Sequence, residues 1–256
     1  MSAPGRPKRE SAPKREARRV VLCARRAAPS ANRPEAPSDE ANPMSLYVPS
    51  HFAMSDRAAI ARLIHDYPFA SLVTPCAPEP FVTHLPLLLV AGCEPHGMLL
   101  GHVARANPHW EQARDIESMA IFQGPHAYVS PSWYGEPAKA VPTWNFTAIH
   151  AHGALEIVDD PVETRGILDA LVQRFEGDRE TPWQFAMPER QRDALVGAIV
   201  AFRIRIRRIT AKFKLSQNRP PADRVRVAKA LEREPYADAA SVAAWMRDYS
   251  IAPHNE

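Results

Sequence analysis

The segment that decides the fold is Ala201–Ile209, which reads AFRIRIRRI. Its apolar side chains Phe202, Ile204 and Ile206 alternate with arginines. Because successive side chains of a β-strand point to opposite faces of a sheet, this alternation predicts a strand with its apolar side on the core and its arginines outward. The fold is therefore expected to contain a sheet with one buried face.

The rest of the chain predicts antiparallel strands with short helices between them. Apolar runs predict strands within residues 69–74, 81–90, 98–103, 119–123, 127–130 and 143–158. Caps and apolar spacing predict helices from Ser55, the expected cap, to Pro68, from Asn107 to about Ile116, from Asp160 to about Phe175, and over 189–199, 222–232 and 239–249. There is no regular strand–helix alternation and no GxGxxG motif. The expected class is α+β, dominated by a β-barrel with peripheral helices.

Charge is unevenly distributed along the 256 residues. Residues 1–43 carry ten basic and five acidic side chains, whereas the rest of the chain carries 22 basic and 24 acidic ones. The Pro-, Ala- and Arg-rich composition of the first part is typical of a disordered tail, and Met44 is an alternative candidate for the natural start. We therefore expect a tail over 1–43, a barrel domain over 44–220 and a helical extension over 221–256.

The near-neutral charge of the chain after residue 43 bears on its partners. Proteins that bind the phosphate backbone of nucleic acids generally show a clustered basic excess, so DNA binding is only weakly supported. No apolar run is long enough to cross a bilayer, and the run Val20–Ala24 is too short for the core of a signal peptide. We therefore expect a cytoplasmic protein with no membrane partner.

The segment Gly101–Trp110, GHVARANPHW, joins a predicted strand to a predicted helix. Such a junction offers backbone N–H groups to an anion, and the side chains of His102 and Arg105 add donors, of which an arginine can grip a phosphate with two hydrogen bonds. The pattern would suit a terminal phosphate such as that of FMN. It is equally compatible with an ordinary corner in which Arg105 is solvated and Asn107 only caps the helix.

Two further segments concentrate groups that suit a planar, polar ligand. Gly124–Tyr134 is dense in aromatic and hydroxyl side chains, which stack on a flavin, form an interface or plug the end of a barrel. Lys212–Pro220 supplies cations and amides, which can meet a phosphate or the edge of a flavin ring, or form a solvated loop. We favour a site for the second segment.

The sequence does not predict a metal centre or catalytic residues. His150 and His152 share one face of a predicted strand, a spacing that can share a metal ion, but no third ligand follows at a suitable distance in sequence. A histidine pair without metal is therefore favoured. No GxSxG, HExxH or Walker motif is present.

Six segments together resemble the PaiB-like family of FMN-binding negative transcriptional regulators, in the family's order and at about its spacing. They are Tyr47–Phe52, Gly101–Trp110, Gly124–His126, Ser130–Tyr134, Val141–Asn145 and Lys214–Pro220. The resemblance spans Leu46 to about Leu231. It implies an FMN-binding split barrel related to the pyridoxamine-phosphate oxidases and flavin reductases, a homodimer, and two FMN molecules bound between the subunits.

The resemblance also implies which residues bind the cofactor. Three would surround the FMN phosphate, four would line the isoalloxazine ring or the dimer seam, and three would reach the cofactor from the C-terminal side, across the dimer in one arrangement. In that order they are His102, Arg105 and Asn107; Ser130, Trp133, Trp144 and Asn145; and Gln217, Asn218 and Arg219.

The function that the resemblance implies is that of a flavin-binding or flavin-sensing negative regulator of transcription. An FMN-dependent oxidoreductase of the pyridoxamine-phosphate oxidase or flavin reductase type is the main alternative, in which the protein positions the cofactor and tunes its electrostatics. A haem-binding barrel is a second alternative, with His84, His102, His126 or His150 as axial ligand. A barrel that dimerises and binds nothing tightly is the fourth.

Overall fold

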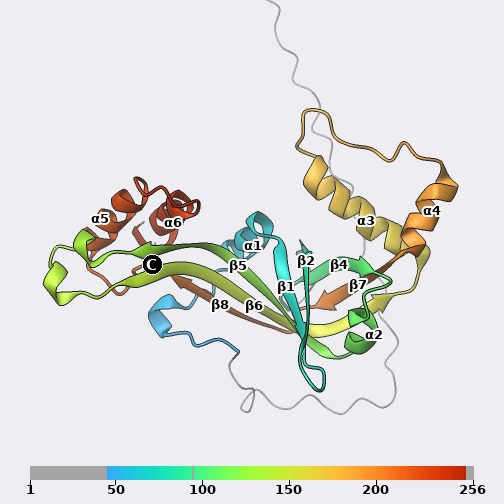
Figure 1. The fold of residues 1–256 in the computed structure, drawn as a ribbon, viewed down its shortest axis with the longest axis horizontal. Coiled ribbons are helices and arrows are strands. Elements are labelled where there is room, and N and C mark those ends of the chain that lie inside the picture. Colours follow the sequence, from blue (N-terminus) through green and yellow to red (C-terminus); the bar gives the residue numbers. More distant parts are fainter. Residues whose placement is uncertain (1–44, 94, 252–256) are drawn as a thin grey trace, which may run out of the picture. The chain divides into compact units, whose positions relative to one another are not determined.

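The computed structural model describes residues 45–93 and 95–251. The predicted tail over 1–43, the expected start at Met44 and the last five residues lie outside this description. The described part of the chain forms an antiparallel sheet with helices around it, as expected for the α+β class (Figure 1).

Eight strands make up the sheet in the described residues, and every pair of neighbours is antiparallel. The strands are β1 Phe69–Thr74, β2 Phe81–Pro86, β3 Leu88–Val90, β4 Met98–Ala104, β5 Glu117–Val129, β6 Thr143–Val158, β7 Ile199–Arg205 and β8 Arg208–Lys214. Their order is β2-β1-β5-β6-β7-β4-β3, and β8 pairs with β6.

One segment closes the sheet into a barrel. Strands β2 and β3 stand at opposite ends of the strand order, yet only Leu87 separates them along the chain. β2 pairs with β1, whereas β3 pairs with β4. Leu87 itself is buried, and its N–H donates to the carbonyl of Pro68 over 2.9 Å. The two ends of the sheet are therefore joined by a single segment that changes partner at Leu87.

The strand predicted over 201–209 is two strands, β7 and β8, so its predicted continuity is wrong. Its predicted facing is confirmed, because Phe202, Ile204 and Ile206 are all fully buried. The ladder breaks at Ile206 and Arg207, whose N–H groups donate instead to the carbonyls of Gly97 and His152. The two strands then share one edge of β6: β8 pairs with its first part and β7 with its end.

Six α-helices lie among the described residues: α1 Arg57–Asp66, α2 His109–Ala113, α3 Pro161–Glu176, α4 Glu189–Gly197, α5 Pro221–Leu231 and α6 Ala239–Met246. The cap of α1 is Asp56 and not Ser55, because the Asp56 carboxylate accepts from the N–H of Ala58 over 2.8 Å. Helix α2 ends before the predicted Ile116. Asp115 adopts a φ of 59°, and its N–H turns away to the carbonyl of Leu155.

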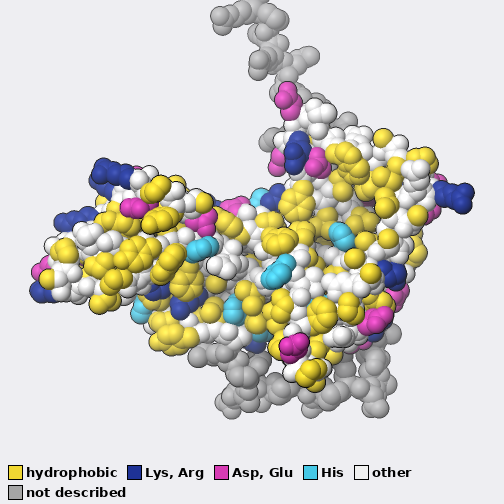
Figure 2. Space-filling model, viewed as in Figure 1, with side chains coloured by type: hydrophobic (Ala, Val, Ile, Leu, Met, Phe, Trp, Pro, Cys, Tyr) yellow, Lys and Arg dark blue, Asp and Glu magenta, His cyan; other side chains and the backbone are white. Residues whose placement is uncertain are grey.

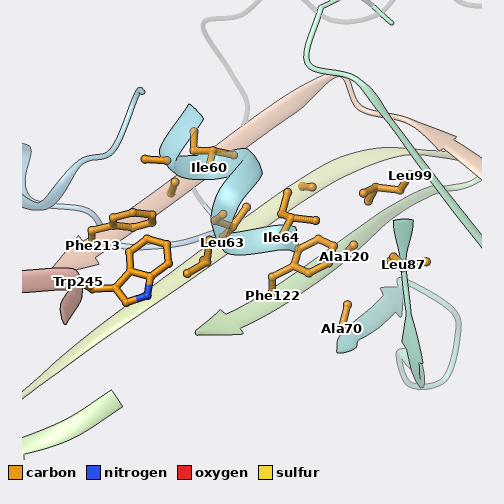
Figure 3. Packing of buried hydrophobic residues seen from close by; sticks show 14 of the residues in the cluster. Ile60, Leu63, Ile64, Ala70, Leu87, Leu99, Ala120, Phe122, Phe213 and Trp245 are labelled. Carbon is orange, nitrogen blue, oxygen red and sulfur yellow. The ribbon is translucent and has the colours of Figure 1, made fainter. Parts of the chain in front are cut away.

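A single apolar cluster connects the barrel, α1 and the two C-terminal helices. Leu63 of α1 lies between Phe122 of β5 on one side and Phe213 and Trp245 on the other (Figure 3). The Phe213 and Trp245 rings meet edge to face, with centroids 5.4 Å apart. Burial of so many aromatic and aliphatic side chains is the main stabilising contribution to the fold.

Helix α3 covers the outer face of β4 and β7 through a second cluster. Ile167 and Leu171 pack there with Met98, Leu100 and Ala201. In the part of the chain that the structure describes, no helix combines the length and apolarity needed to span a membrane.

Candidate functional site

The corner between β4 and α2 carries the three residues predicted to surround a phosphate. His102 lies on β4, its Nδ1 atom is buried without a hydrogen-bond partner, and burial lowers the pKa of its imidazole. Arg105 follows the strand; its Nε donates to the carbonyl of Gly197 over 2.6 Å and its Nη2 to that of Ile199 over 2.8 Å. Arg105 therefore ties the corner to the junction of α4 and β7, and only Nη1 has no partner within the described residues.

Asn107 shapes the corner through both ends of its amide. Its Oδ1 accepts from the N–H of His109 over 3.0 Å at the start of the short helix. Its Nδ2 donates to the hydroxyl of Thr83 on β2 over 3.1 Å. Helix α2 begins one residue later than predicted, with Pro108 and not Asn107 in the cap position. Helix α2 has only five residues, so the corner's geometry depends on these side-chain bonds rather than on the helix.

A cleft of about 330 Å³ opens beside Arg105. Two further guanidinium groups line it, those of Arg114 and Arg165, each balanced by a carboxylate of Asp159 or Asp193. The cleft therefore offers three cationic side chains, of which two already have an acidic partner. Such a donor set suits an anion.

The other seven predicted residues lie around the far ends of β5 and β6, next to α5 and α6. The side chain of Asn145 is fully buried and donates to Ser216 over 2.9 Å. That of Gln217 is used within its own loop, accepting from Leu215 N–H and donating to the Phe213 carbonyl. Both amides are thus bound to protein atoms in the single chain, which sequence alone does not reveal.

The remaining members of this far group present cationic and aromatic surface. The Arg219 guanidinium lies 4.5 Å from the centroid of the Tyr134 ring. The indole of Trp144 is 52% exposed. Trp133 packs against the core, the Ser130 hydroxyl bonds that of Ser132, and Asn218 is exposed. Figure 2 shows apolar side chains at the surface over β5 and β6, in the region next to α5 and α6.

The structure does not bring all ten predicted residues together in one chain. The two groups lie at opposite ends of β5, whose 13 residues trace about 40 Å of strand at roughly 3.3 Å per residue. FMN is much shorter than this contour. Within one chain, three residues gather at the corner and seven at the far group.

Two polar features lie outside the set of residues predicted to bind the cofactor, although Lys214 belongs to a segment that the sequence singled out. Lys214, in the far group, donates to Thr143 Oγ1 over 2.6 Å and to the Trp144 carbonyl, and burial, followed by the charges of Lys212 and Arg219, lowers its pKa. At the corner, His109 bonds the hydroxyls of Thr83 and Thr74, and Thr74 in turn bonds that of Ser118, so that hydroxyls of three strands form one chain. The lone Thr and Ser residues of this chain gave no signal in the sequence, because they are spread over more than forty positions.

The pair His150 and His152 is buried on the outward side of β6. The hydroxyl of Ser45 lies 3.2 Å from His150 Nδ1 and 2.9 Å from His152 Nε2. Burial, together with the nearby charge of Arg208, holds the pKa of His152 at about 4. No group of three or more metal-ligating side chains occurs among the residues that the structure describes.

Comparison with known proteins gives matches over most of this chain. The family model described as "Putative FMN-binding domain" matches residues 46–208. The chain is 34% identical over 206 residues to protease synthase and sporulation protein PAI 2 of Bacillus subtilis (strain 168), covering 79% of this chain and 97% of that protein. It is 31% identical over 219 residues to an uncharacterized protein, AN0679, of Emericella nidulans, covering 70% of this chain and 87% of that protein.

Two solved structures illustrate the similarity of fold. The flavocytochrome Anf3 from Azotobacter vinelandii aligns with a TM-score of 0.53 at 17% identity, over 70% of this chain and 76% of that one. The FAD and heme binding protein from Mycobacterium smegmatis aligns with a TM-score of 0.50 at 16% identity, over 63% and 73%. At these identities the likeness concerns the fold alone.

Proposed function

The chain belongs to the family of FMN-binding domains, and from this premise we propose that it holds FMN with the phosphate at the β4–α2 corner. The predicted PaiB-like membership and the predicted split-barrel fold are confirmed, and the cofactor of the family is FMN. When bound, FMN supplies electron and hydride transfer; the residues of this chain bind and orient it.

The corner fits the phosphate end of the cofactor. One cleft is lined by the guanidinium groups of Arg114, Arg165 and Arg105, whose Nη1 is free in the described part of the chain. The adjoining strand β4 carries His102, whose buried Nδ1 has no partner among the described residues. Asn107 fixes the backbone between them. The single observation that carries the proposal is this convergence of cationic donors at a corner braced by Arg105.

The proposed site is completed by a second copy of the chain. The corner and the far group lie at opposite ends of β5, so one FMN can meet both only if the far group comes from another subunit. The half-exposed Trp144 and the exposed Val141 supply apolar surface that a dimer would cover. We therefore propose a homodimer with two FMN sites, each formed by one corner and the partner's far group, which includes Ser130, Trp133, Asn145, Gln217, Asn218 and Arg219.

A titration tests the phosphate site. We expect the fluorescence of FMN to be quenched saturably when the full chain is added. Arg105→Ala should weaken FMN binding by at least about tenfold, the order expected for the loss of one charge-assisted contact. Arg190→Ala, at an exposed arginine of α4, is the matched control and should bind as the parent does. Equal affinity in Arg105→Ala, with its thermal midpoint unchanged, would contradict the assignment.

Subunit complementation tests the shared site. Homodimers of Arg105→Ala and of Arg219→Ala should both bind FMN weakly. A heterodimer of the two variants carries both defects in one site and none in the other. Mixing them should therefore restore one tight site per heterodimer, which is about one site in four after random subunit exchange. Failure of the mixed dimer to regain any tight site would rule out a site built from two subunits. A molar mass of one chain, measured by light scattering on the parent protein, would rule it out as well.

We propose that the biological role is negative regulation of transcription that depends on the bound flavin, as the PaiB-like family name implies. Residues 44–256 carry slightly more acidic than basic side chains, so we expect little salt-dependent affinity for DNA. Deletion of the gene should raise transcripts of its targets, and Arg105→Ala should fail to restore repression. NAD(P)H oxidation by the FMN-loaded protein, well above free FMN, would favour the oxidoreductase instead, and a Soret band on haem addition would favour haem binding.

The domain division is part of the same proposal. Residues 44–220 would form the FMN-binding barrel and 221–256 a helical extension. Helices α5 and α6 add Val227, Leu231 and Trp245 to the apolar cluster of the barrel, which supports an extension packed onto the barrel rather than an independent unit.

A further inference from the structure

A chain of hydrogen bonds, half-buried at its two ends and buried around Thr74, runs from the cofactor corner to the start of β5. Asn107 Nδ2 lies 3.1 Å from Thr83 Oγ1, which lies 2.7 Å from His109 Nδ1. On the other side of the imidazole, His109 Nε2 lies 2.9 Å from Thr74 Oγ1, and Thr74 Oγ1 lies 2.7 Å from Ser118 Oγ. The chain ends where Ser118 Oγ approaches the carbonyl of Ile116. It links α2, β1, β2 and β5.

The two ends of this chain fix the direction of every bond in it. The Asn107 carbonyl oxygen already accepts from the N–H of His109, so the group facing Thr83 is the amide NH₂, which can only donate. At the other end the Ile116 carbonyl can only accept. The chain has five gaps and five hydrogens, and each gap is filled only if Thr83 donates to Nδ1 of the imidazole and Nε2 donates to Thr74.

The opposite tautomer leaves the chain incomplete. With the proton on Nδ1, Thr83 would receive two donors and its own hydrogen would have no place in the chain. Thr74 would then give its hydrogen to Nε2, and the single hydrogen of Ser118 would have to serve both Thr74 and the Ile116 carbonyl. A buried polar contact without a hydrogen is costly, so the geometry selects the neutral Nε2–H form of His109.

We propose that His109 is the positioning residue of the cofactor corner: as a neutral Nε2–H imidazole it holds Thr83 and Asn107, and through them the backbone that carries Arg105. This inference rests on the proposed FMN site. His109 would not touch the cofactor. It acts by fixing the amide of Asn107, whose two hydrogen bonds shape the five-residue helix start.

Acid should undo this arrangement. A protonated His109 has two N–H donors, so Nδ1 would point a hydrogen at Thr83, where the Asn107 amide already donates. His109 is 1% exposed, and burial lowers the pKa of its imidazole. The groups around it are uncharged: Thr74, Thr83, Ser118 and the Phe81 ring, 4.7 Å away between centroids.

Two of the charged side chains close in sequence to this cluster have partners. Glu117, beside Ser118, pairs with Arg207 over 3.4 Å, and Arg114, just after α2, pairs with Asp159 over 3.8 Å. Protonation of His109 would therefore place a charge in the cluster with no carboxylate in contact with it among the described residues.

The tautomer can be measured without any cofactor. In protein labelled with ¹⁵N at histidine, the His109 signals, assigned by their loss in His109→Gln, should show a protonated Nε2 and an unprotonated Nδ1 at pH 7.5. A proton on Nδ1, or a doubly protonated ring at that pH, would overturn the inference. This readout does not depend on whether FMN binds.

The positioning role is tested by FMN affinity as a function of pH. Gln offers one acceptor and one donor in place of the imidazole but does not titrate, so His109→Gln should keep most of the affinity at pH 7.5. His109→Leu should lose about tenfold, the factor expected when a buried hydrogen-bond partner is removed. As the pH is lowered from 7.5 until the His109 nitrogen signals show a doubly protonated ring, the parent should lose several-fold more affinity than His109→Gln, which carries the same titration of the FMN phosphate.

A matched control is His84→Gln, at an exposed histidine of β2 that bonds the Ser71 hydroxyl over 2.9 Å. It should follow the parent at every pH. Identical pH profiles for the parent and His109→Gln, or unchanged affinity in His109→Leu, would overturn the positioning role. No FMN binding by any of the proteins would overturn the proposed function and this role with it, while the tautomer would still be decided by the nitrogen spectra.

Discussion

Replacing Gly124 by alanine should destabilise the protein through one identifiable clash. Gly124 lies where the β5–β6 register shifts, between Gln123 and His126. A Cβ atom there would come 2.2 Å from Thr147 Oγ1 and 2.6 Å from Leu63 Cδ1. Real Cβ contacts are essentially never below 3.0 Å, so the neighbours must move. Overpacking of this kind typically costs about 1–3 kcal/mol.

The cost should depend on the Thr147 hydroxyl. Thr147 is fully buried, and its Oγ1 has no hydrogen-bond partner among the described residues. Thr147→Ala alone removes this unpaired hydroxyl together with a methyl group, so we expect a change within about 1 kcal/mol. In the double variant only the flexible end of Leu63 opposes the new Cβ. The two substitutions should therefore be non-additive, with the double variant recovering about 1 kcal/mol or more.

Urea unfolding, followed by circular dichroism, measures all four corners of this cycle. Gly166→Ala is the matched control, because a Cβ at Gly166 in α3 meets nothing within 4 Å. It should stabilise by about 0.5–1 kcal/mol through helix propensity. A Gly124→Ala protein as stable as the parent, or strictly additive costs in the double variant, would refute the clash.

Three further changes test the packing and the charges. Because burial holds the pKa of His152 at about 4, the unfolded chain binds more protons between pH 6.5 and 4. Stability should therefore fall through that window by at most about 3 kcal/mol, and equal urea midpoints at the two pH values would contradict this. Trp245→Ala, at a buried ring stacked on Tyr249 with centroids 5.1 Å apart, should cost about 3–5 kcal/mol; an unchanged urea midpoint would show that α6 is not part of the core. Arg203→Met leaves Glu156 and Glu163 without their shared cation, which lies 3.0 and 2.6 Å from them, and should cost about 1–2 kcal/mol at low salt. An Arg203→Met variant as stable as the parent would show that the two ion pairs of Arg203 contribute nothing to the free energy of unfolding.

The periodicity of the sequence identified strands well where one face is buried. Phe202, Ile204 and Ile206 point to the core as the alternation predicts. The interruption after Arg205 was not predictable, because the sequence continues its alternation there while the backbone bonds change partner to Gly97 and His152. Ser55 and Asp56 are both good caps, and only the geometry shows which one bonds Ala58.

The candidate site was predictable as segments and not as contacts. Sequence order placed Arg105 and Asn107 at a strand–helix corner, which is where they lie. It could not show that two N–H donors of Arg105 are hydrogen-bonded to backbone carbonyls. Nor could it assemble His109 with Thr74 and Thr83, because a lone polar residue in an apolar strand acquires partners only when distant strands meet.

The change of partner at Leu87 also restricts how the chain can vary in length. Inserting or deleting one residue there would turn every side chain of β2 or of β3 to the opposite face of the sheet. The two ends of the sheet would then no longer be joined in the same register. The exposed stretch between Gly177 and Pro188, which joins α3 to α4, takes no part in any strand pairing. Evolution can lengthen or shorten that stretch, or engineering can place a reporter domain in it, without disturbing the barrel.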